Sequence, residues 1–444
     1  MSSNVNNLDA AFKQRYSAEG IARLTFEDRP FWGLVPKEEI AGADQVTRAF
    51  AVPVLFANNA AVGGNFALSQ ARSALVSSKV NAFQITTSKY YGFVTLDMES
   101  VERSVGNENA FVDLKSLEID QTIENVSNRL HRNAWNNGDG TIGQVGNSTQ
   151  MPSFSTSVCV LNDLERMVFI QPGDELTVSP SGTPQSGERA FGSNGHGLYV
   201  IAVNLDAGTF QVGDVNGNAV NLNSVTDGIP TIAALDWLAI RGDRQVPGTV
   251  GGTCFAGFQG WIPNAATGIA SSGDSFYNVN RYQSVDWLAG TRFDGSNFAI
   301  EDALVQGSNI LAKKGGTCNA GFINHKHFSA LVNSISSRGQ VQFLEVSPSE
   351  YPTIGYRGVR IIGAKSDIDI IPDYACPGTV AALMNLEDWA FASVGGEDPV
   401  RFMNGDGLEF LRQPTSDSIQ AYVVNYGALY CRKPRNNANI TLAA

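Results

Sequence analysis

A single long apolar stripe constrains this chain more than any other feature of its sequence. Between Asn109 and Trp135, apolar residues recur at spacings of 7, 4, 3, 4 and 4, which places them along one side of one helix. These residues are Val112, Ile119, Ile123, Val126, Leu130 and Ala134. Such a helix is about 38 Å long, and a Gly-Asp-Gly turn at Gly138–Gly140 ends it. We therefore expect a helical spine along which other elements pack.

The segment before this helix predicts a long β-hairpin over residues 46–97. An apolar run leads to a tip that contains Gly63-Gly64, and the returning run alternates at period two. The alternating positions are Phe83, Ile85, Thr87 and Lys89. A hairpin of about 50 residues has too little apolar surface to form a core of its own. We expect it to project from the body and to pair with another surface.

Residues 1–45 are typical of an extended arm. A short amphipathic helix is expected over Leu8–Tyr16. Further on, Phe31 and Trp32 lie between two prolines, which argue against a helix there. Two interpretations of these large aromatic side chains are equally open: they pack on the same chain, or they pack on a neighbouring chain.

Residues 150–260 differ in character from their surroundings. Short alternating runs are separated by Gly, Asp and Asn, and Asn204–Gly208 has the composition of a hairpin turn. This pattern predicts a compact β-barrel or β-sandwich domain inserted into the chain. The segment from 151 to 260 has ten acidic residues and four arginines, so its net charge of −6 is half of the total of −12. We expect this acidic surface to face outward into solvent.

The C-terminal part mixes helices and strands. One helix is expected over about Phe298–Lys314, with acidic residues in its first turn, lysines in its last turn and Gly315 behind it. A second helix is expected over Lys326–Ser337. The expected strands are Val359–Ala364, Ile368–Ile371, Val380–Met384, Ala390–Val394 and Ile419–Arg432.

Composition narrows the classes of function. Charged residues make up only 17% of the chain, below the usual quarter, which indicates a surface covered by neighbouring subunits. A net charge of −12 argues against nucleic-acid recognition, and no apolar run is long enough to span a membrane. The five cysteines are scattered without a CxxC pair, and the N-terminus lacks a signal-peptide core. We therefore expect folding in the cytosol and no zinc site.

Catalytic motifs are absent from the sequence, which has no HExxH, no GxSxG and no GxxxxGK[ST] loop. Of the four histidines, His325 and His327 flank a lysine at a helix start, and His131 is expected to be a partly exposed structural residue. Glu387 and Asp388 could form a carboxylate pair, yet nothing nearby supplies a partner for acid–base chemistry. We expect a protein that is not an enzyme, with no cofactor and no metal.

Four stretches, in this order, carry a resemblance to a known family. They are "LHRNAWNNGDGTIGQ", "FDGSNFAIEDALVQGSNILAKKGG", "GFINHKHFSALVNSI" and the closing strands "YRGVRIIGAKSDIDIIPDYACPGTVAALMNLEDWAFASVG" with "FLRQPTSDSIQAYVVNYGALYCRKPRNNANI". Their order and spacing resemble the major capsid protein of tailed bacteriophages, which has the Hong Kong 97-type fold. The resemblance implies an α+β fold and covers nearly the whole chain except 150–260, which looks like the extra domain that some members carry.

The resemblance also implies a division of the chain into parts. They are an N-terminal arm (1–45), an extended hairpin loop (46–97), a peripheral domain with the spine helix (98–149 and 261–295), the inserted β-domain (150–260), an axial domain (296–410) and a C-terminal strand that returns to the peripheral domain (411–444). In this arrangement Asn385–Trp389 is a short turn between two strands of the axial domain, capped by its acids, with Trp389 as a core or interface anchor.

The implied function is structural. Many identical copies form pentamers and hexamers that close into an icosahedral shell, the virion capsid, which encloses phage DNA without sequence-specific binding. Assembly is expected in the cytoplasm of the host bacterium, without a membrane. A separate scaffolding protein is implied, because no long charged helical segment precedes the arm, and a portal is a further implied partner. Whether a decoration protein joins the shell is left open.

The hairpin and the arm are the parts that the resemblance places on neighbouring subunits. The candidate interface residues are Phe31, Trp32, Phe56, Phe66, Lys79, Phe83, Lys89, Tyr90, Tyr91 and Trp389. Some relatives link a hairpin lysine covalently to an asparagine of a neighbour. Lys79 and Lys89 are hairpin lysines, but the sequence marks no asparagine or acid for that chemistry.

Two alternatives stay open. A bacterial encapsulin is a cargo-holding shell of the same fold, against which the chain length and the insertion at 150–260 argue. A β-rich carbohydrate-binding protein or glycosidase belongs to another class, and only scattered carboxylates and tryptophans favour it.

Overall fold

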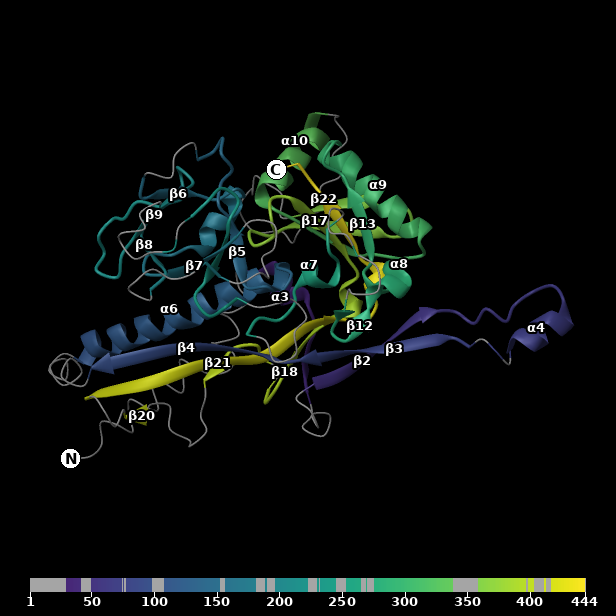
Figure 1. The fold of residues 1–444 in the computed structure, drawn as a ribbon, viewed down its shortest axis with the longest axis horizontal. Helices are drawn as coiled ribbons and strands as arrows, with labels where there is room; N and C mark the ends of the chain where they lie inside the picture. The colour runs from purple at the N-terminus through teal and green to yellow at the C-terminus, as the bar shows by residue number, and fades with distance from the viewer. Residues whose placement is uncertain are drawn as a thin grey trace, which may run out of the picture.

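Helices and strands occupy partly separate regions of the chain, which gives an α+β architecture (Figure 1). The structure is a computed structural model. It describes residues 29–40, 49–73, 75, 77–97, 108–151, 156–180, 188–189, 196–222, 230, 232–244, 253–264, 269, 275–337, 358–396, 398–402, 411–412 and 417–443. The helix expected over Leu8–Tyr16 and most of the predicted arm lie outside the described residues.

The spine helix is α6 (Glu108–Trp135), whose predicted bounds are correct to within one residue. Its apolar stripe is buried at the described positions Ile119, Ile123, Val126, Leu130 and Ala134. The turn behind it requires glycine, because Gly140 has a φ of +78° and a Cβ there would lie 2.0 Å from the carbonyl oxygen of Asp243. The helix is therefore tied to the end of the β-domain that follows it.

A long six-stranded sheet lies against α6 (Figure 1). Its strands are β1 (Lys37–Glu39), β4 (Ser88–Asp97), β18 (Trp389–Ser393), β19 (Arg401–Phe402), β20 (Leu411–Arg412) and β21 (Ser418–Cys431). β4 pairs antiparallel with β21 along its whole length, and every second residue of β4 is buried. Gly92 lets the helix approach, because a Cβ there would lie 2.8 Å from methyl groups of both Thr122 and Val126.

The hairpin projects from the body, as the sequence predicts (Figure 1). β2 (Ala49–Ala57) and β3 (Lys79–Thr86) pair antiparallel, and a short helix, α4 (Phe66–Ser73), lies near the tip. The returning run contributes strands to two sheets. Its first part, β3, pairs with β2 in the hairpin, and its continuation, β4, belongs to the long sheet of the body. The buried positions change phase at this junction, from Phe83 and Ile85 to Ser88 and Tyr90. Lys89 therefore faces away from the helix, and the single alternation predicted through it is wrong.

The described part of the arm contains a helix that the sequence analysis excluded. α3 (Pro30–Leu34) begins at a proline, and the first helical position tolerates proline because its amide has no partner there in any case. Phe31 and Trp32 are fully buried, with ring centroids 5.0 Å from Trp135 and 4.9 Å from Phe391 respectively. Of the two interpretations left open for these residues, packing on the same chain is the one observed.

Six strands between Thr141 and Ile240 build a small antiparallel barrel beside the spine helix (Figure 1). Its strands run in the order β5 (Thr141–Gln144), β10 (Trp237–Ile240), β7 (Glu175–Ser179), β8 (Leu198–Asn204), β9 (Thr209–Gly213) and β6 (Val158–Val160). The two edge strands, β5 and β6, meet and close the barrel. The Gly146 amide donates to the Val160 carbonyl at 2.8 Å, and the Asn162 amide donates to the Gln144 carbonyl at 2.8 Å. The barrel begins before the predicted 150 and ends before 260, since α7 (Phe258–Trp261) packs in the main core.

A second six-stranded sheet carries the remaining helices, α9 (Ile300–Lys313) and α10 (His325–Ser337). Its order is β13 (Thr291–Asp294), β22 (Ala438–Thr441), β17 (Val380–Met384), β14 (Ala320–Ile323), β16 (Asp367–Pro372) and β15 (Val359–Ile362). The predicted helices and strands of this region are confirmed. The predicted ranges 261–295 and 411–444 each supply strands to this sheet, while β18 and β19 from the predicted axial range belong to the long sheet.

The stretch Asn385–Trp389 joins the two sheets rather than two strands of one domain, because it leads from β17 to β18 through a turn of 3₁₀ helix. Asn437 supports it, since its side-chain oxygen accepts from the Trp389 indole and from the Asn385 amide, each at 2.9 Å. The Asp388 carboxylate accepts from the Asn385 and Asn436 side chains at 2.7 and 2.6 Å. Trp389 is 1% exposed and serves as a core anchor at this junction.

We expect Asn437→Ala to destabilise the chain through this junction. The change removes the acceptor of two donors, and a buried donor without a partner costs about 1–3 kcal/mol. Thermal unfolding followed by scanning fluorimetry should show a midpoint several degrees lower. Asn58→Ala, at an exposed hairpin position, is the control and should leave the midpoint unchanged. Equal shifts in the two variants would contradict the junction's role.

Candidate assembly surfaces

Five of the ten candidate interface residues lie in the core of their own chain. They are Phe31, Trp32, Phe83, Tyr90 and Trp389, each less than a tenth exposed. Phe83, for example, has its ring centroid 5.0 Å from that of Trp261. Side chains buried in this way have no surface to offer a neighbour in this conformation, so the candidate interface is reduced to the exposed members of the set.

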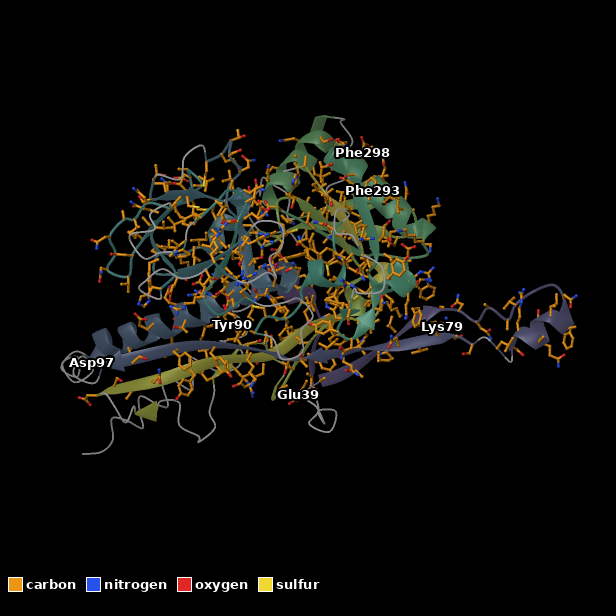
Figure 2. The ribbon with its side chains drawn as sticks, viewed as in Figure 1. Glu39, Lys79, Tyr90, Asp97, Phe293 and Phe298 are labelled. Carbon is orange, nitrogen blue, oxygen red and sulfur yellow. The ribbon has the colours of Figure 1, made fainter. Side chains whose placement is uncertain are left out.

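The exposed members are on the hairpin and on the outer face of β4. Phe66, Lys79, Lys89 and Tyr91 are exposed, and Phe56 is half-buried. Figure 2 shows Lys79 on the projecting part of the hairpin, whereas Tyr90 lies beside the spine helix. The structure therefore does not bring the ten residues together into one site.

The hairpin tip is an exposed apolar surface. We define the tip surface as Val62, Phe66, Leu68, Leu75 and Val80, which are 59–84% exposed. The tip has local order, because Asn65 accepts the Leu68 amide at 3.1 Å and the Ser69 hydroxyl donates to the Gly63 carbonyl at 3.2 Å. Residues 58–80 contain two cations, Arg72 and Lys79, and no acid. The tip is thus a preformed apolar and basic surface.

A polar groove runs along the spine helix, at the other end of the molecule from the tip (Figure 1). It has a volume of about 450 Å³ and lies between α6, the outer edge of β4 and Gln171 of the barrel. Two exposed acids of α6, Glu118 and Glu124, line it, and its one lining cation, Arg129, is paired with Asp174 at 2.6 Å. We call it the spine groove. Its excess charge is negative, opposite to that of the tip.

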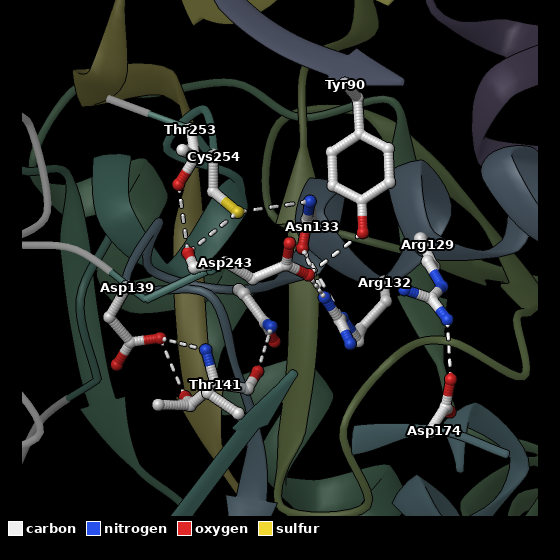
Figure 3. Close-up of polar contacts among 12 residues, drawn as sticks. Tyr90, Arg129, Arg132, Asn133, Asp139, Thr141, Asp174, Asp243, Thr253 and Cys254 are labelled. Atoms are coloured by element: carbon white, nitrogen blue, oxygen red, sulfur yellow. Dashed lines mark hydrogen bonds and ion pairs between the residues drawn. The ribbon is translucent and has the colours of Figure 1, made fainter. Parts of the chain in front are cut away.

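A buried polar cluster joins the hairpin root, the spine helix and the exit of the barrel (Figure 3). The Tyr90 hydroxyl of β4 donates to the Asp243 carboxylate at 2.9 Å, and Arg132 of α6 lies 3.1 Å from the same oxygen. The Cys254 thiol donates to the Asp243 carbonyl at 3.3 Å. None of these residues except Tyr90 was predicted from the sequence to belong to a site. No signal in the sequence pairs residues so distant along the chain.

A second buried pair links the spine helix to the other sheet. His131 Nε2 lies 2.8 Å from the Asp373 carboxylate, and neither side chain is exposed. The partly exposed position expected for His131 is therefore wrong. Its neighbour Tyr374 donates its hydroxyl to the Asn128 side chain at 2.9 Å. The helix thus contacts the loop after β16 through two adjacent polar contacts.

The cysteine thiols show no sign of nucleophilic chemistry. All five are buried and free of disulfides. Burial raises the pKa of Cys159 to about 12 and that of Cys318 to about 11, and burial followed by Asp243 raises the pKa of Cys254 further. A thiol is reactive only as its thiolate, and these thiols stay protonated at neutral pH.

Among the residues that the structure describes, no group of three or more His, Cys, Asp or Glu side chains is placed to hold a metal ion. Likewise, none of the helices in the described part of the chain is long and apolar enough to cross a membrane.

Comparison with known proteins gives matches in structure but not in sequence. No protein-family model matches the chain, and no curated protein matches it. Among solved structures, the capsid asymmetric unit of cyanophage A-1(L) is 10% identical with a TM-score of 0.48, over 94% of this chain and 92% of that chain. The putative capsid protein of an E. coli CFT073 prophage is 10% identical with a TM-score of 0.37, over 98% of both chains.

A shell protein of another kind is also similar. The chain of the holo-SrpI encapsulin complex from Synechococcus elongatus PCC 7942 is 9% identical with a TM-score of 0.35, over 98% of this chain and 94% of that chain.

We expect the stability of the chain to fall at alkaline pH. Each buried thiol, and Tyr90, has a folded-state pKa above its unfolded value of about 8.5 or 10. The stabilisation from such a group is complete below the unfolded pKa and is lost as pH rises toward the folded pKa. The thermal midpoint should therefore decrease from pH 8 to pH 10.5, and less steeply in Cys159→Ala. A midpoint that stays constant or rises over this range would refute the assignment.

Proposed function

We propose that this chain is the major capsid protein of a tailed bacteriophage, a structural subunit whose copies assemble as pentamers and hexamers into an icosahedral shell. The observation that carries the proposal is the tip of the projecting hairpin. All eight residues of α4 lack burial, although the helix presents large apolar side chains such as Phe66 and Leu68. Surfaces of this kind mark contacts with another molecule.

The energies of such a contact fit an assembly of many copies. Burying the five side chains of the tip surface on a neighbour would release about 1.5–3 kcal/mol each, or about 8–15 kcal/mol in all. The loss of translational and rotational freedom costs about 4–15 kcal/mol. One contact between two copies is therefore weak. A closed shell is strong because every copy takes part in many contacts at once.

The placement of the two surfaces favours rings. The tip and the spine groove lie toward opposite ends of the long axis of the molecule (Figure 1). The cations Arg72 and Lys79 at the tip would meet Glu118 and Glu124 in the groove of a neighbour. A contact between two different surfaces is heterologous, and it repeats around a ring when the rotation closes. Five or six copies would then make one capsomer.

The contents and partners of the shell follow from the same proposal. A net charge of −12 would keep the wall from adhering to the DNA that it encloses. A portal and a separate scaffolding protein are the further partners that we expect, and the bacterial cytoplasm is the expected place of assembly. The chain would have no catalytic role, in keeping with its protonated thiols.

An encapsulin-type compartment is the second candidate. Chain length does not separate the two, because the similar SrpI encapsulin has nearly the same length as this chain. The genes beside this one would discriminate, since portal and terminase genes belong to a phage and a cargo enzyme belongs to an encapsulin.

Electron microscopy tests the class of protein directly. The expressed chain, alone or with the products of its neighbouring genes, should form closed shells or rings of five or six copies. A monomer with sugar-dependent melting would instead favour the carbohydrate-binding alternative and would overturn the proposal.

Deletion of Val62–Ser78 tests the role of the hairpin. The variant should keep the circular dichroism and the size of a folded subunit, because none of the described residues in this segment is buried, and it should not form stable shells. Val215→Ser, at an exposed apolar position on a barrel turn, is the control and should assemble normally. Normal assembly of the deletion variant would show that the hairpin is not the contact.

A further inference from the structure

The barrel carries an exposed apolar surface that nothing above explains. Leu164 and Leu205 are 50% and 58% exposed, and we call these two residues the leucine knob. They lie on neighbouring segments, because the Leu164 side chain would come within 2.8 Å of a Cβ at Gly208, at the end of the turn that holds Leu205. The knob therefore combines exposed leucines from two adjacent segments of the barrel.

Two acids, Glu165 and Asp206, are next to the leucines of the knob in the sequence, and Asp206 is on an exposed turn. The carboxylate of a third acid, Asp163, is engaged within the chain, because it accepts the amides of Glu165 and Gly378. The segment from 151 to 260 contains no lysine, and two of its four arginines are already paired, Arg189 with Asp236 and Arg241 with Glu175. An apolar projection with acidic surroundings fits a partner surface that is apolar at its centre and basic at its rim.

The chain contains a groove with that chemistry at the root of its hairpin. It has a volume of about 740 Å³, its lining is mainly apolar, and its walls include Leu55 of β2, Trp287 and Tyr430. Its rim is the most basic stretch of the sequence, with Arg432, Lys433 and Arg435 within four residues. We call it the root groove.

The charge of the root groove is only partly neutralised within the chain. Arg432 is paired with Glu38, and the Lys433 ammonium lies 3.8 Å from Asp388 with its side chain 70% exposed. Arg435 lies 4.1 Å over the Trp287 ring and donates to the Lys314 carbonyl, which holds its guanidinium at the rim. Three cations thus face two acids, and the excess is positive on a chain whose net charge is −12.

We propose that the leucine knob of one copy of this chain docks in the root groove of the adjacent copy. The inference rests on the proposed function, because it needs copies held side by side. Apolar surface meets apolar surface at the centre, and Asp206 and Glu165 meet Lys433 and its neighbours at the rim. Opposite charges at the rim of an interface set which surfaces meet and in what register.

The arrangement of the chain requires this contact to form between copies. The barrel strands β6, β8 and β9 lie on one side of the molecule, and α8 (Val285–Leu288) and β2, which border the root groove, lie on the other (Figure 1). A contact between them is heterologous, like that of the hairpin tip, and it joins the same two sides of neighbouring copies around a ring. The barrel would then give each pair of neighbours a second point of attachment.

Cysteine crosslinking tests the contact in assembled particles. The double variant Leu205→Cys, Leu55→Cys places one thiol on the knob and one in the groove, and the native cysteines are all buried. A short bismaleimide should then link neighbours into a ladder from dimers up to five or six copies on a denaturing gel. Either single variant should give no ladder, because the contact joins two different surfaces.

A matched pair provides the control. Val215 is also half exposed and also follows an acid, but it lies on the turn at the other end of β9. The double variant Val215→Cys, Leu55→Cys should give no ladder. Shells that form without a Leu205–Leu55 ladder, equal ladders from both pairs, or a ladder from one cysteine alone would overturn the inference while the proposed function stands. Absence of any shell or ring would contradict both this inference and the proposed function.

Charge exchange tests the rim independently. Lys433→Glu and Asp206→Lys should each slow assembly several-fold in light scattering, because each places like charges across the contact. The double variant restores opposite charges and should regain most of the rate. A double variant as slow as the single variants would exclude this pairing.

Discussion

The close packing of α6 on β4 is the contact on which the rest of the molecule depends. Gly92 allows it, because any side chain there would meet methyl groups of Thr122 and Val126 at 2.8 Å. β4 pairs with the long C-terminal strand β21, and it is also the direct continuation of β3. One strand therefore fixes the helix, closes the sheet and sets the direction in which the hairpin leaves the body.

The C-terminal end of α6 connects this contact to the other parts. Arg132 and Tyr90 share the Asp243 carboxylate at the exit of the barrel, and His131 meets Asp373 beside the second sheet. Buried charged groups are costly once separated from their partners. Moving the barrel or the second sheet relative to the helix would break such a pair. These polar contacts add to one continuous hydrophobic core that joins the barrel, the helix and both sheets.

The elements that could be predicted from the sequence are those defined by local periodicity. The stripe of α6, the dipole order and glycine of α9, and the short apolar runs of β17 and β18 are each contained within a short window, and each is present in the structure. What the sequence analysis missed depends on distant partners. Tyr90 and Asp243 lie 153 positions apart, and no local pattern signals their contact.

The errors have physical causes as well. The two prolines around Phe31 and Trp32 argue against a helix at α3, but the first helical position needs no amide donor and tolerates Pro30. The aromatic residues of the arm leave burial on the same chain or on a neighbour open, and Phe83 of the hairpin root is a candidate interface residue, because their partners Trp135, Phe391 and Trp261 are remote in sequence. Size and hydrophobicity predict that a side chain is buried, but they do not predict which chain buries it.

In the hairpin, the position of a residue along one strand determines whether its own chain or another molecule can bury its side chain. In β3 the residues nearest the body, Phe83 and Ile85, are fully buried, whereas Lys79 and Val80 at the far end are exposed. The root therefore obtains its burial from its own chain, and the tip can obtain it only from another molecule. Because the root is rigidly packed, the tip is presented in a defined direction before any partner arrives, which lowers the entropy cost of each contact. The angle between neighbours, and with it the curvature of the proposed shell, would then be set by the packing of the root rather than by the chemistry of the tip.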